Sequence, residues 1–333
     1  MRSEALLVAC AAAALAAPNR AHAKPLLAVS AEAGGEVVLV DPATAQVVER
    51  IKVGPRPRGL KPSRDGKRLL VAVAGPPKAA AGDKSAGLAI VDVVARKVAK
   101  QISTPPAPFA VDLSPDERTA FVSNSDTNEL FLIDVAAGTV AKKAPGGTEP
   151  QGLAVRRDGK AVFIAAHGGA EVSAIDPKTT KLLMRIDAGP RPQTILLAPH
   201  GDRGFAIDEG LPLVTMIDTK GNAFKQELLL QGLAKTPAPV LQSGVLSPDG
   251  KSIYLTTGPG RSVLFVDIAT KKVVATVDGV GAFPRGIAVS PDGKKLYTAN
   301  GASNDVAIVD VAGKKVEAHV AVPGSPWGVA LLK

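Results

Sequence analysis

Short apolar runs that end in an aspartate recur along the whole chain. Their residues are apolar at consecutive positions, as expected for strands that are covered on both faces. The seven runs end at Asp41, Asp92, Asp134, Asp176, Asp218, Asp267 and Asp310, in steps of 51, 42, 42, 42, 49 and 43 residues. A period of about 40 residues built from short strands is typical of a β-propeller, in which each repeat forms one four-stranded sheet.

The repeat nearest the C-terminus shows all four strands most clearly. We expect strands at 284–290, 295–299, 306–310 and 315–320, with a Pro-Asp-Gly turn between the first two. Glycine allows the positive φ of such a turn, and aspartate bonds to the backbone two residues on. Related turns occur at 64–66, 114–116, 157–159, 199–201 and 248–250. The connections are too short and too rich in Gly and Pro for the crossover helices of a parallel α/β sheet.

The two ends of the chain determine the number of blades. Residues 26–30 match a second strand and residues 326–331 match a first strand, with six complete repeats between them. The sequence therefore predicts an all-β fold, a seven-bladed β-propeller of four-stranded antiparallel blades closed by the C-terminal strand joining the N-terminal blade. Two insertions lengthen the repeat: a surface loop at 75–87, and 226–239, where we expect one or two helical turns at 227–233.

The first 23 residues differ from the rest. Arg2 precedes an apolar, Ala-rich stretch that ends before Ala21-His22-Ala23, an A-x-A cleavage signal. The stretch is too short to span a bilayer, so we predict a cleaved signal peptide at 1–23, no membrane span, and a single propeller domain at 24–333 in the periplasm. Cys10, the only cysteine, lies in a segment resembling a lipoprotein box, and lipid anchoring is the alternative. Otherwise the mature chain contains no thiol.

The formal net charge is +9, and removal of residues 1–23 leaves +8. This favours acidic partners or anionic surfaces, although solvation of lysines in turns explains it equally well. Single-stranded nucleic-acid binding is an alternative that the composition disfavours. Only 3% of the residues are aromatic, so base stacking would depend on Trp327 and Phe109.

Motifs for catalysis and metal binding are missing from the sequence. His167, His200 and His319 lie in different repeats without the spacing of metal ligands, and no G-x-S-x-G motif occurs. Turn formation explains the aspartates at the strand ends better than metal binding does. We therefore expect neither a metal nor a cofactor. Propeller lactonases and other hydrolases exist, so a missing motif leaves hydrolysis open.

A candidate binding site comes from positions that vary within otherwise similar repeats. A proline precedes each first strand, and the residue after it varies: Arg58, Phe109, Gln151, Gln193, Val240, Arg285 and Trp327. First strands line the channel of a propeller, so these residues should surround one mouth. From them and two nearby arginines we predict a site for a ligand or partner at Arg56, Arg58, Gln151, Arg191, Gln193, Arg285 and Trp327. Guanidinium and amide groups beside an aromatic ring suit a carboxylate. The alternative is that these residues only set the turns and fill the channel.

Two segments, 284–300 and 304–310, resemble the YVTN-repeat family of bacterial and archaeal propellers. The name motif is closest at Leu296-Tyr297-Thr298-Ala299-Asn300, followed by Phe121-Val122-Ser123-Asn124. The resemblance implies an exported seven-bladed propeller. Residues 300–306, 326–329 and 258–259 are also similar to propellers associated with PQQ-dependent alcohol catabolism, which accompany quinoprotein dehydrogenases without being the dehydrogenase. The insertion at 75–87 and a shortened motif at 165–168 depart from that pattern.

These observations together favour a binding protein over an enzyme. We expect a non-catalytic, monomeric periplasmic propeller that recognises an acidic protein surface or an anionic small molecule at one channel mouth. The resemblance implies an accessory role in a quinoprotein dehydrogenase system. One alternative is a hydrolase of the lactonase type, with carboxylates and His167 near the mouth. The other is single-stranded nucleic-acid binding.

Overall fold

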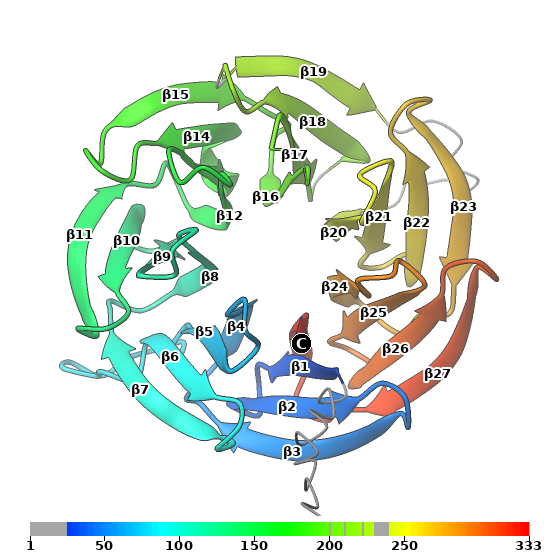
Figure 1. Cartoon of the computed structure of the whole chain (residues 1–333), viewed down its shortest axis with the longest axis horizontal. Helices are drawn as coiled ribbons and strands as arrows, with labels where there is room; N and C mark the ends of the chain where they lie inside the picture. Colours follow the sequence, from blue (N-terminus) through cyan, green and yellow to red (C-terminus); the bar gives the residue numbers. More distant parts are fainter. Residues whose placement is uncertain (1–24, 200, 210, 222, 230–239, 333) are drawn as a thin grey trace, which may run out of the picture.

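A computed structural model describes residues 25–199, 201–209, 211–221, 223–229 and 240–332. Within these residues the chain forms seven four-stranded antiparallel sheets that surround a central axis as blades (Figure 1). The first strand of each blade lies nearest the axis and the fourth lies on the outside. The predicted all-β, seven-bladed propeller is confirmed.

The blades follow one another in chain order. The N-terminal blade contains β28 (Pro326–Leu332), β1 (Leu26–Ala31), β2 (Glu36–Asp41) and β3 (Gln46–Lys52). The next three contain β4 (Pro57–Pro62), β5 (Arg68–Val73), β6 (Gly87–Asp92), β7 (Lys97–Ser103); β8 (Pro108–Leu113), β9 (Thr119–Asn124), β10 (Glu129–Asp134), β11 (Thr139–Pro145); and β12 (Pro150–Val155), β13 (Val162–Ala166), β14 (Glu171–Ile175), β15 (Leu182–Asp187). The last three contain β16 (Pro192–Leu197), β17 (Arg203–Asp208), β18 (Leu213–Asp218), β19 (Ala223–Leu229); β20 (Leu241–Leu246), β21 (Ser252–Thr257), β22 (Ser262–Asp267), β23 (Lys272–Asp278); and β24 (Pro284–Val289), β25 (Lys295–Asn300), β26 (Asp305–Asp310), β27 (Lys315–Ala321). A short 3-10 helix, η1 (His167–Gly169), follows β13.

The C-terminal strand closes the ring as predicted. β28 pairs antiparallel with β1, so that Leu27 lies opposite Leu331 and Ala28 opposite Ala330. In Figure 1 the C-terminus lies beside β1, on the axial side of the N-terminal blade. Because the two ends of the chain pair within one sheet, β1 is not left as the exposed edge of an incomplete, three-stranded blade.

Side chains of the third strands pack alternately against the two neighbouring blades. In β10, Phe131 and Ile133 join the apolar cluster shared with the preceding blade, whereas Leu130 and Leu132 join the cluster shared with the following one. All four side chains are buried. This arrangement explains the consecutive apolar residues in the sequence, and burying each side chain stabilises the fold by roughly 1.5–3 kcal/mol.

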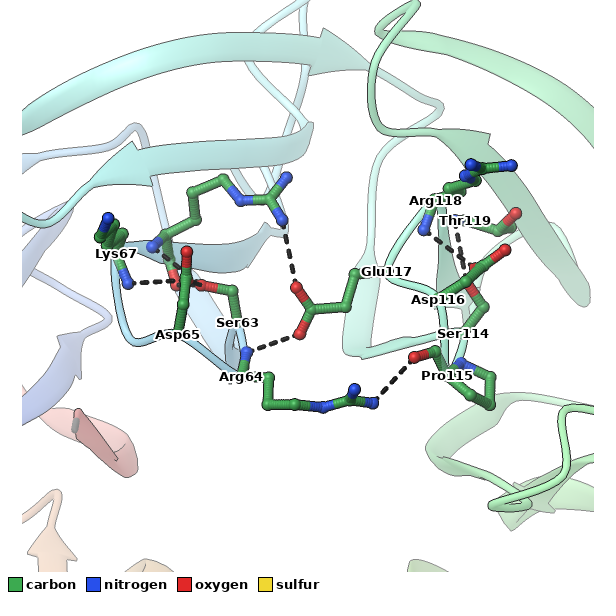
Figure 2. Close-up of polar contacts among 11 residues, drawn as sticks. Ser63, Arg64, Asp65, Lys67, Ser114, Pro115, Asp116, Glu117, Arg118 and Thr119 are labelled. Carbon is green, nitrogen blue, oxygen red and sulfur yellow. Dashed lines mark hydrogen bonds and ion pairs between the residues drawn. The ribbon is translucent and has the colours of Figure 1, made fainter.

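At the rim opposite the candidate site, neighbouring blades contact each other through their first turns (Figure 2). Glu117 occupies the turn position that Gly66 occupies in the preceding blade, and its φ of 58° is in the left-handed region. Its carboxylate accepts hydrogen bonds from the backbone N–H of Arg64 and from Arg68 Nη2, the latter at 3.2 Å. The Arg64 side chain donates to the carbonyl of Pro115 at 2.8 Å. A strained turn residue therefore connects two blades.

The aspartates at the strand ends form turns on the same rim. For example, Asp41 Oδ1 accepts a hydrogen bond from the backbone N–H of Ala43, and Asp134 Oδ1 accepts one from Ala137, both at 2.8 Å. Among the described residues, no group of three His, Cys, Asp or Glu side chains could hold a metal ion. In the same part of the chain, no helix has the length and hydropathy needed to cross a membrane.

Two sequence predictions concern segments at the edge of what the structure describes. The expected helical turns at 227–233 are wrong for 227–229, because these residues belong to β19 and pair with β18, Glu227 opposite Thr215 and Leu229 opposite Leu213. The remainder of that segment, 230–239, lies outside the described residues, as do the predicted signal peptide at 1–23 and Cys10.

Candidate functional site

A bulge near the start of each first strand directs side chains toward the channel. In β24, Pro284 pairs with Asn300 and Ile287 pairs with Thr298, so Arg285 and Gly286 lie opposite a single residue of β25. A bulge of this kind bends the strand and re-aims its side chains. The pairing of every first strand with its second strand shifts register in the same region.

Neighbouring first strands approach so closely that some positions accept only glycine. A Cβ atom on Gly286 would lie 2.7 Å from the carbonyl oxygen of Trp327, and one on Gly328 would lie 2.8 Å from that of Arg58. Hydroxyl groups of second strands also hold the bulges. Ser30 Oγ donates to the Arg58 carbonyl at 2.7 Å, and Thr256 Oγ1 donates to the Arg285 carbonyl at 3.1 Å. The backbone beneath both arginines is therefore fixed by the adjacent blade.

These strands enclose a cavity of about 240 Å³ at one end of the channel. All seven first strands contribute to its lining, and its polar and aromatic side chains are Arg58, Phe109, Gln193, Thr194, Gln242, Ser243, Arg285 and Trp327. Pockets for drug-sized ligands measure about 300–1,000 Å³, so this cavity suits a compact molecule.

Two guanidinium groups stack on the single tryptophan. The Cζ atoms of Arg58 and Arg285 lie 4.6 Å and 4.0 Å from the Trp327 ring centroid. Phe109 packs edge-on against the same ring, with centroids 5.7 Å apart. Burial lowers the pKa of both Arg58 and Arg285, yet a guanidinium remains charged at neutral pH. Trp327 thus contacts two cations in a partly desolvated site.

The two arginines differ in their counter-charges. Arg58 Nε lies 3.1 Å from Glu32 Oε1, and the same oxygen lies 3.4 Å from Arg56 Nε. No carboxylate among the described residues lies within ion-pair distance of Arg285, and its Nε is buried without a hydrogen-bond partner. Arg285 is half-buried, and a partly desolvated charge without an opposite charge in contact is costly, which marks Arg285 as a group that lacks its complement.

A second cluster lies beside the cavity and comes from two neighbouring blades. His167 in η1 places Nε2 3.0 Å from Glu209 Oε2 and 3.2 Å from Arg191 Nε. Arg191 Nη2 lies 3.1 Å from the same Glu209 oxygen. Gln242 donates to Glu209 Oε1 at 3.3 Å and also lines the cavity. Gln242 therefore connects the cluster to the cavity.

The hydrogen-bonding role of His167 Nε2 depends on which ring nitrogen carries the proton. His167 Nε2 either donates to Glu209 or accepts from Arg191, because one nitrogen cannot do both. Its Nδ1 is buried without a hydrogen bond, 3.6 Å from Glu149 Oε2. The hydrogen bond from His167 is the main cause that lowers the pKa of Glu209, so this carboxylate is ionised at neutral pH. A buried imidazole beside an ionised carboxylate is suited to accept a proton.

The structure brings together part of the predicted set. Arg58, Gln193, Arg285 and Trp327 line the cavity, whereas Arg56 and Arg191 contact Glu32 and Glu209 beside it. Gln151 occupies the corresponding position in β12, with its amide Oε1 buried and without a hydrogen bond.

Val240 does not hold the position assigned to it. Leu241 pairs with Thr257 as Pro284 pairs with Asn300, so Gln242 is the counterpart of Arg285. No proline begins β20, so the residue that follows a proline in this repeat, Val240, precedes the equivalent position by two residues. From the sequence, His167 was related to the mouth only through the lactonase alternative, and no pairing with Glu209 was expected. Their contact joins residues 42 positions apart, and no local motif reveals it.

The fold and this mouth define a seven-bladed β-propeller with a compact cavity, lined by polar and apolar side chains, at one end of its channel. Residues 27–203 match the family model of the YNCE-like beta-propeller, which is more than half of the chain. The chain belongs to that family. No curated protein matches it by sequence.

Several solved structures share the fold at low sequence identity. The Pseudomonas aeruginosa periplasmic gluconolactonase PpgL has a TM-score of 0.75 and 19% identity, covering 93% of this chain and 99% of its own. A Bacteroides uniformis protein assigned as a 6-phosphogluconolactonase has a TM-score of 0.74 and 18% identity, and the match covers 92% of this chain and 99% of that protein. Kuenenia stuttgartiensis hydrazine synthase has a TM-score of 0.70 and 21% identity, and the match covers 82% of this chain and 88% of that chain. At these identities the similarity establishes the fold alone.

The lactonases among these structures contradict two expectations from the sequence, namely a non-catalytic binding or scaffold propeller and the absence of enzymatic activity. The geometry supplies a physical reason for this correction. Arg56, Arg58 and Arg191, which were expected to attract an acidic partner, already contact Glu32 or Glu209 within the chain. Their charges are therefore largely compensated before any partner arrives.

Proposed function

We propose that this protein is a hydrolase of sugar lactones that works at the channel mouth. The observation that carries the proposal is the cluster of His167, Glu209 and Arg191 beside a compact cavity that contains two arginines. The shared fold with PpgL and with the Bacteroides uniformis protein supports the same reaction class. The proposed binding residues are Arg58, Gln151, Gln193, Gln242, Arg285 and Trp327.

Lactone hydrolysis requires a base and a group that stabilises negative charge. Water adds its oxygen to the carbonyl carbon and loses a proton, the carbonyl oxygen becomes an oxyanion, and the bond to the ring oxygen then breaks. His167 takes the proton from water, and ionised Glu209 stabilises the resulting imidazolium. The imidazolium then returns the proton to the ring oxygen as it leaves. Arg191 provides positive charge near the oxyanion.

A direct test compares lactone hydrolysis by the purified native chain and by His167→Asn and Glu209→Gln variants. We expect each variant to lower the rate on glucono-1,5-lactone about 10²- to 10⁴-fold, the usual effect of losing general-base catalysis. Proton release at constant pH, corrected for spontaneous hydrolysis, measures the rate. His319→Asn, on the outer strand β27, is the matched control and should retain native activity. A native chain that accelerates no lactone in a panel of ring sizes would refute the proposal.

The cellular setting follows from the sequence predictions, which remain part of this proposal. We place the mature chain, as a monomer, in the periplasm. PpgL is named as a protein of the same compartment. The resemblance to propellers that accompany quinoprotein dehydrogenases fits this reaction chemically, because oxidation of a cyclic hemiacetal yields a lactone. A periplasmic lactonase would consume such a product and needs no cofactor of its own.

A further inference from the structure

Arg285 is the guanidinium at the mouth whose charge the described part of the chain leaves without direct compensation. Arg58 contacts Glu32 and Arg191 contacts Glu209, each at 3.1 Å. Arg285 has no such contact, although its surroundings bury it enough to lower its pKa. Glu32 and Glu209 influence it only over a longer distance. An anion that binds here would supply the missing charge.

The position of Arg285 is prepared for such a ligand. Its Cζ atom lies 4.0 Å from the Trp327 ring centroid and 4.8 Å from that of Phe283. Stacking on rings leaves the N–H groups free, because they lie in the guanidinium plane. Arg285 lines the cavity, and Thr256 of the preceding blade holds its backbone carbonyl. The side chain therefore presents donors to the cavity from a fixed base.

We infer that the preferred substrate is a lactone with one free carboxylate, bound edge-on by Arg285, such as the monolactone of a sugar diacid. The inference rests on the proposed lactonase function and specifies its substrate class. A carboxylate is planar and offers two oxygens that match one edge of a guanidinium. A neutral aldonolactone has a hydroxymethyl group in place of that carboxylate, and its binding would leave the charge of Arg285 uncompensated.

A phosphate fits this site less well than a carboxylate. A phosphate monoester carries about −1.5 to −2 charges at neutral pH and three acceptor oxygens, which calls for several cationic donors. Beside Arg285 the cavity offers the amides of Gln193 and Gln242 and the rings of Phe109 and Trp327. Arg58 also lines the cavity and stacks on Trp327, but its charge is already paired with Glu32. One uncompensated guanidinium matches one carboxylate.

Two lactones that differ only at this group provide the test. Glucaro-1,4-lactone and glucono-1,4-lactone share the ring and differ in a carboxylate against a hydroxymethyl group. We expect the native chain to favour the carboxylate by about 10- to 100-fold in kcat/KM, the effect of one charged hydrogen-bonded pair. Arg285→Gln should bring that ratio close to one. Lys294→Gln removes a positive charge from the opposite rim of the same blade and should keep the ratio. 6-Phosphogluconolactone, which carries a phosphate instead of the carboxylate, should have a lower kcat/KM than glucaro-1,4-lactone.

A binding measurement separates this inference from the lactonase proposal. Trp327 is the only tryptophan, so its fluorescence reports on the cavity without turnover. We expect glucuronate to change the emission at concentrations at least tenfold below those needed for glucose, which has a hydroxymethyl group in place of the carboxylate, with the difference lost in Arg285→Gln. Binding without hydrolysis of either lactone would refute the function and keep the carboxylate site. Hydrolysis with equal preference, preference for phosphate, or preference that survives Arg285→Gln would overturn the inference and keep the function.

Discussion

Equivalent positions of the first strands carry different chemistry because their surroundings differ. Arg58 and Arg285 follow the first proline of β4 and β24, and both stack on Trp327. Glu32 contacts Arg58, whereas the described residues offer Arg285 no carboxylate at that distance. In β20 the same position is Gln242, whose amide donates to Glu209. The identity of one neighbour thus decides whether a side chain supports the site or remains available to a ligand.

The ionisation of Glu209 leads to a prediction on stability at low pH. Its pKa is below the ordinary value of 4.5, chiefly because of the hydrogen bond with His167. A lowered pKa means that the carboxylate stabilises the folded state above its unfolded pKa and that this contribution is lost as pH falls through the folded pKa. We expect the native chain to exceed Glu209→Gln in Tm at pH 6–7.

Thermal unfolding of the two proteins from pH 7 down to pH 3 measures this contribution. The difference in Tm should narrow below about pH 4.5 and approach zero at the acidic end. The same scan on Glu129→Gln provides a control, because Glu129 pairs with Lys143 on exposed surface. A difference that stays constant over the whole range would show that the Glu209 carboxylate is not stabilised by its neighbours.

At the scale of strands, the sequence was informative where residues contact their own repeat. The first strand expected at 284–290 corresponds to β24, and the turn at its end follows from Pro-Asp-Gly. The helical turns expected at 227–233 failed for 227–229, because pairing with β18 overrides the helix preference of Glu and Leu. Bulges were also not foreseen. They depend on how closely neighbouring blades approach, which one repeat does not encode.

That close approach predicts a specific cost at Gly286. A methyl group there would lie 2.7 Å from the Trp327 carbonyl oxygen and 2.9 Å from the Gly328 Cα, both in the backbone of β28. Neither side can move without shifting a first strand, so we expect Gly286→Ala to lower the free energy of unfolding by about 1–3 kcal/mol. It should also weaken lactone hydrolysis, because Arg285 and Trp327 flank the contact.

Gly34→Ala is the matched control for this substitution. A methyl group there would meet its nearest atoms at 3.6 Å, ordinary contact distance, and the φ of Gly34 is outside the left-handed region. Chemical denaturation of both variants measures the difference in stability. Equal effects of the two substitutions would mean that the first strands have more room than the structure shows.

At the scale of the whole molecule, the repeat period determined the fold, but not the cluster that carries the proposed chemistry. Seven strand-end aspartates at near-equal spacing count the blades, and the chain ends show how the ring closes. His167, Arg191 and Glu209 meet only because η1 and the ends of two strands in the next blade converge at one rim. Each residue taken alone in the sequence is an ordinary loop residue. Their proximity is a property of the ring.

Ring closure leads to the last prediction. Ala28 in β1 lies opposite Ala330 in β28, and the partners of an antiparallel pair have Cα atoms about 4.5–5.5 Å apart, within the range of a disulfide. The mature chain expected from the sequence has no other cysteine, so Ala28→Cys with Ala330→Cys can form only this bond. A cross-link that joins the two ends of the ring restricts the unfolded chain over nearly its whole length. We expect a stabilisation of about 2–4 kcal/mol.

Thermal unfolding of the double variant under oxidising and reducing conditions isolates that effect, because one protein serves as its own control. The oxidised form should unfold at higher temperature than the reduced form, and each single-cysteine variant should show no such difference. If separation of β28 from β1 is the first step of unfolding, the unfolding rate of the oxidised form should also fall. An unchanged rate with a higher Tm would instead mean that the ring opens first between two other blades, and that the closing blade is not its weakest point.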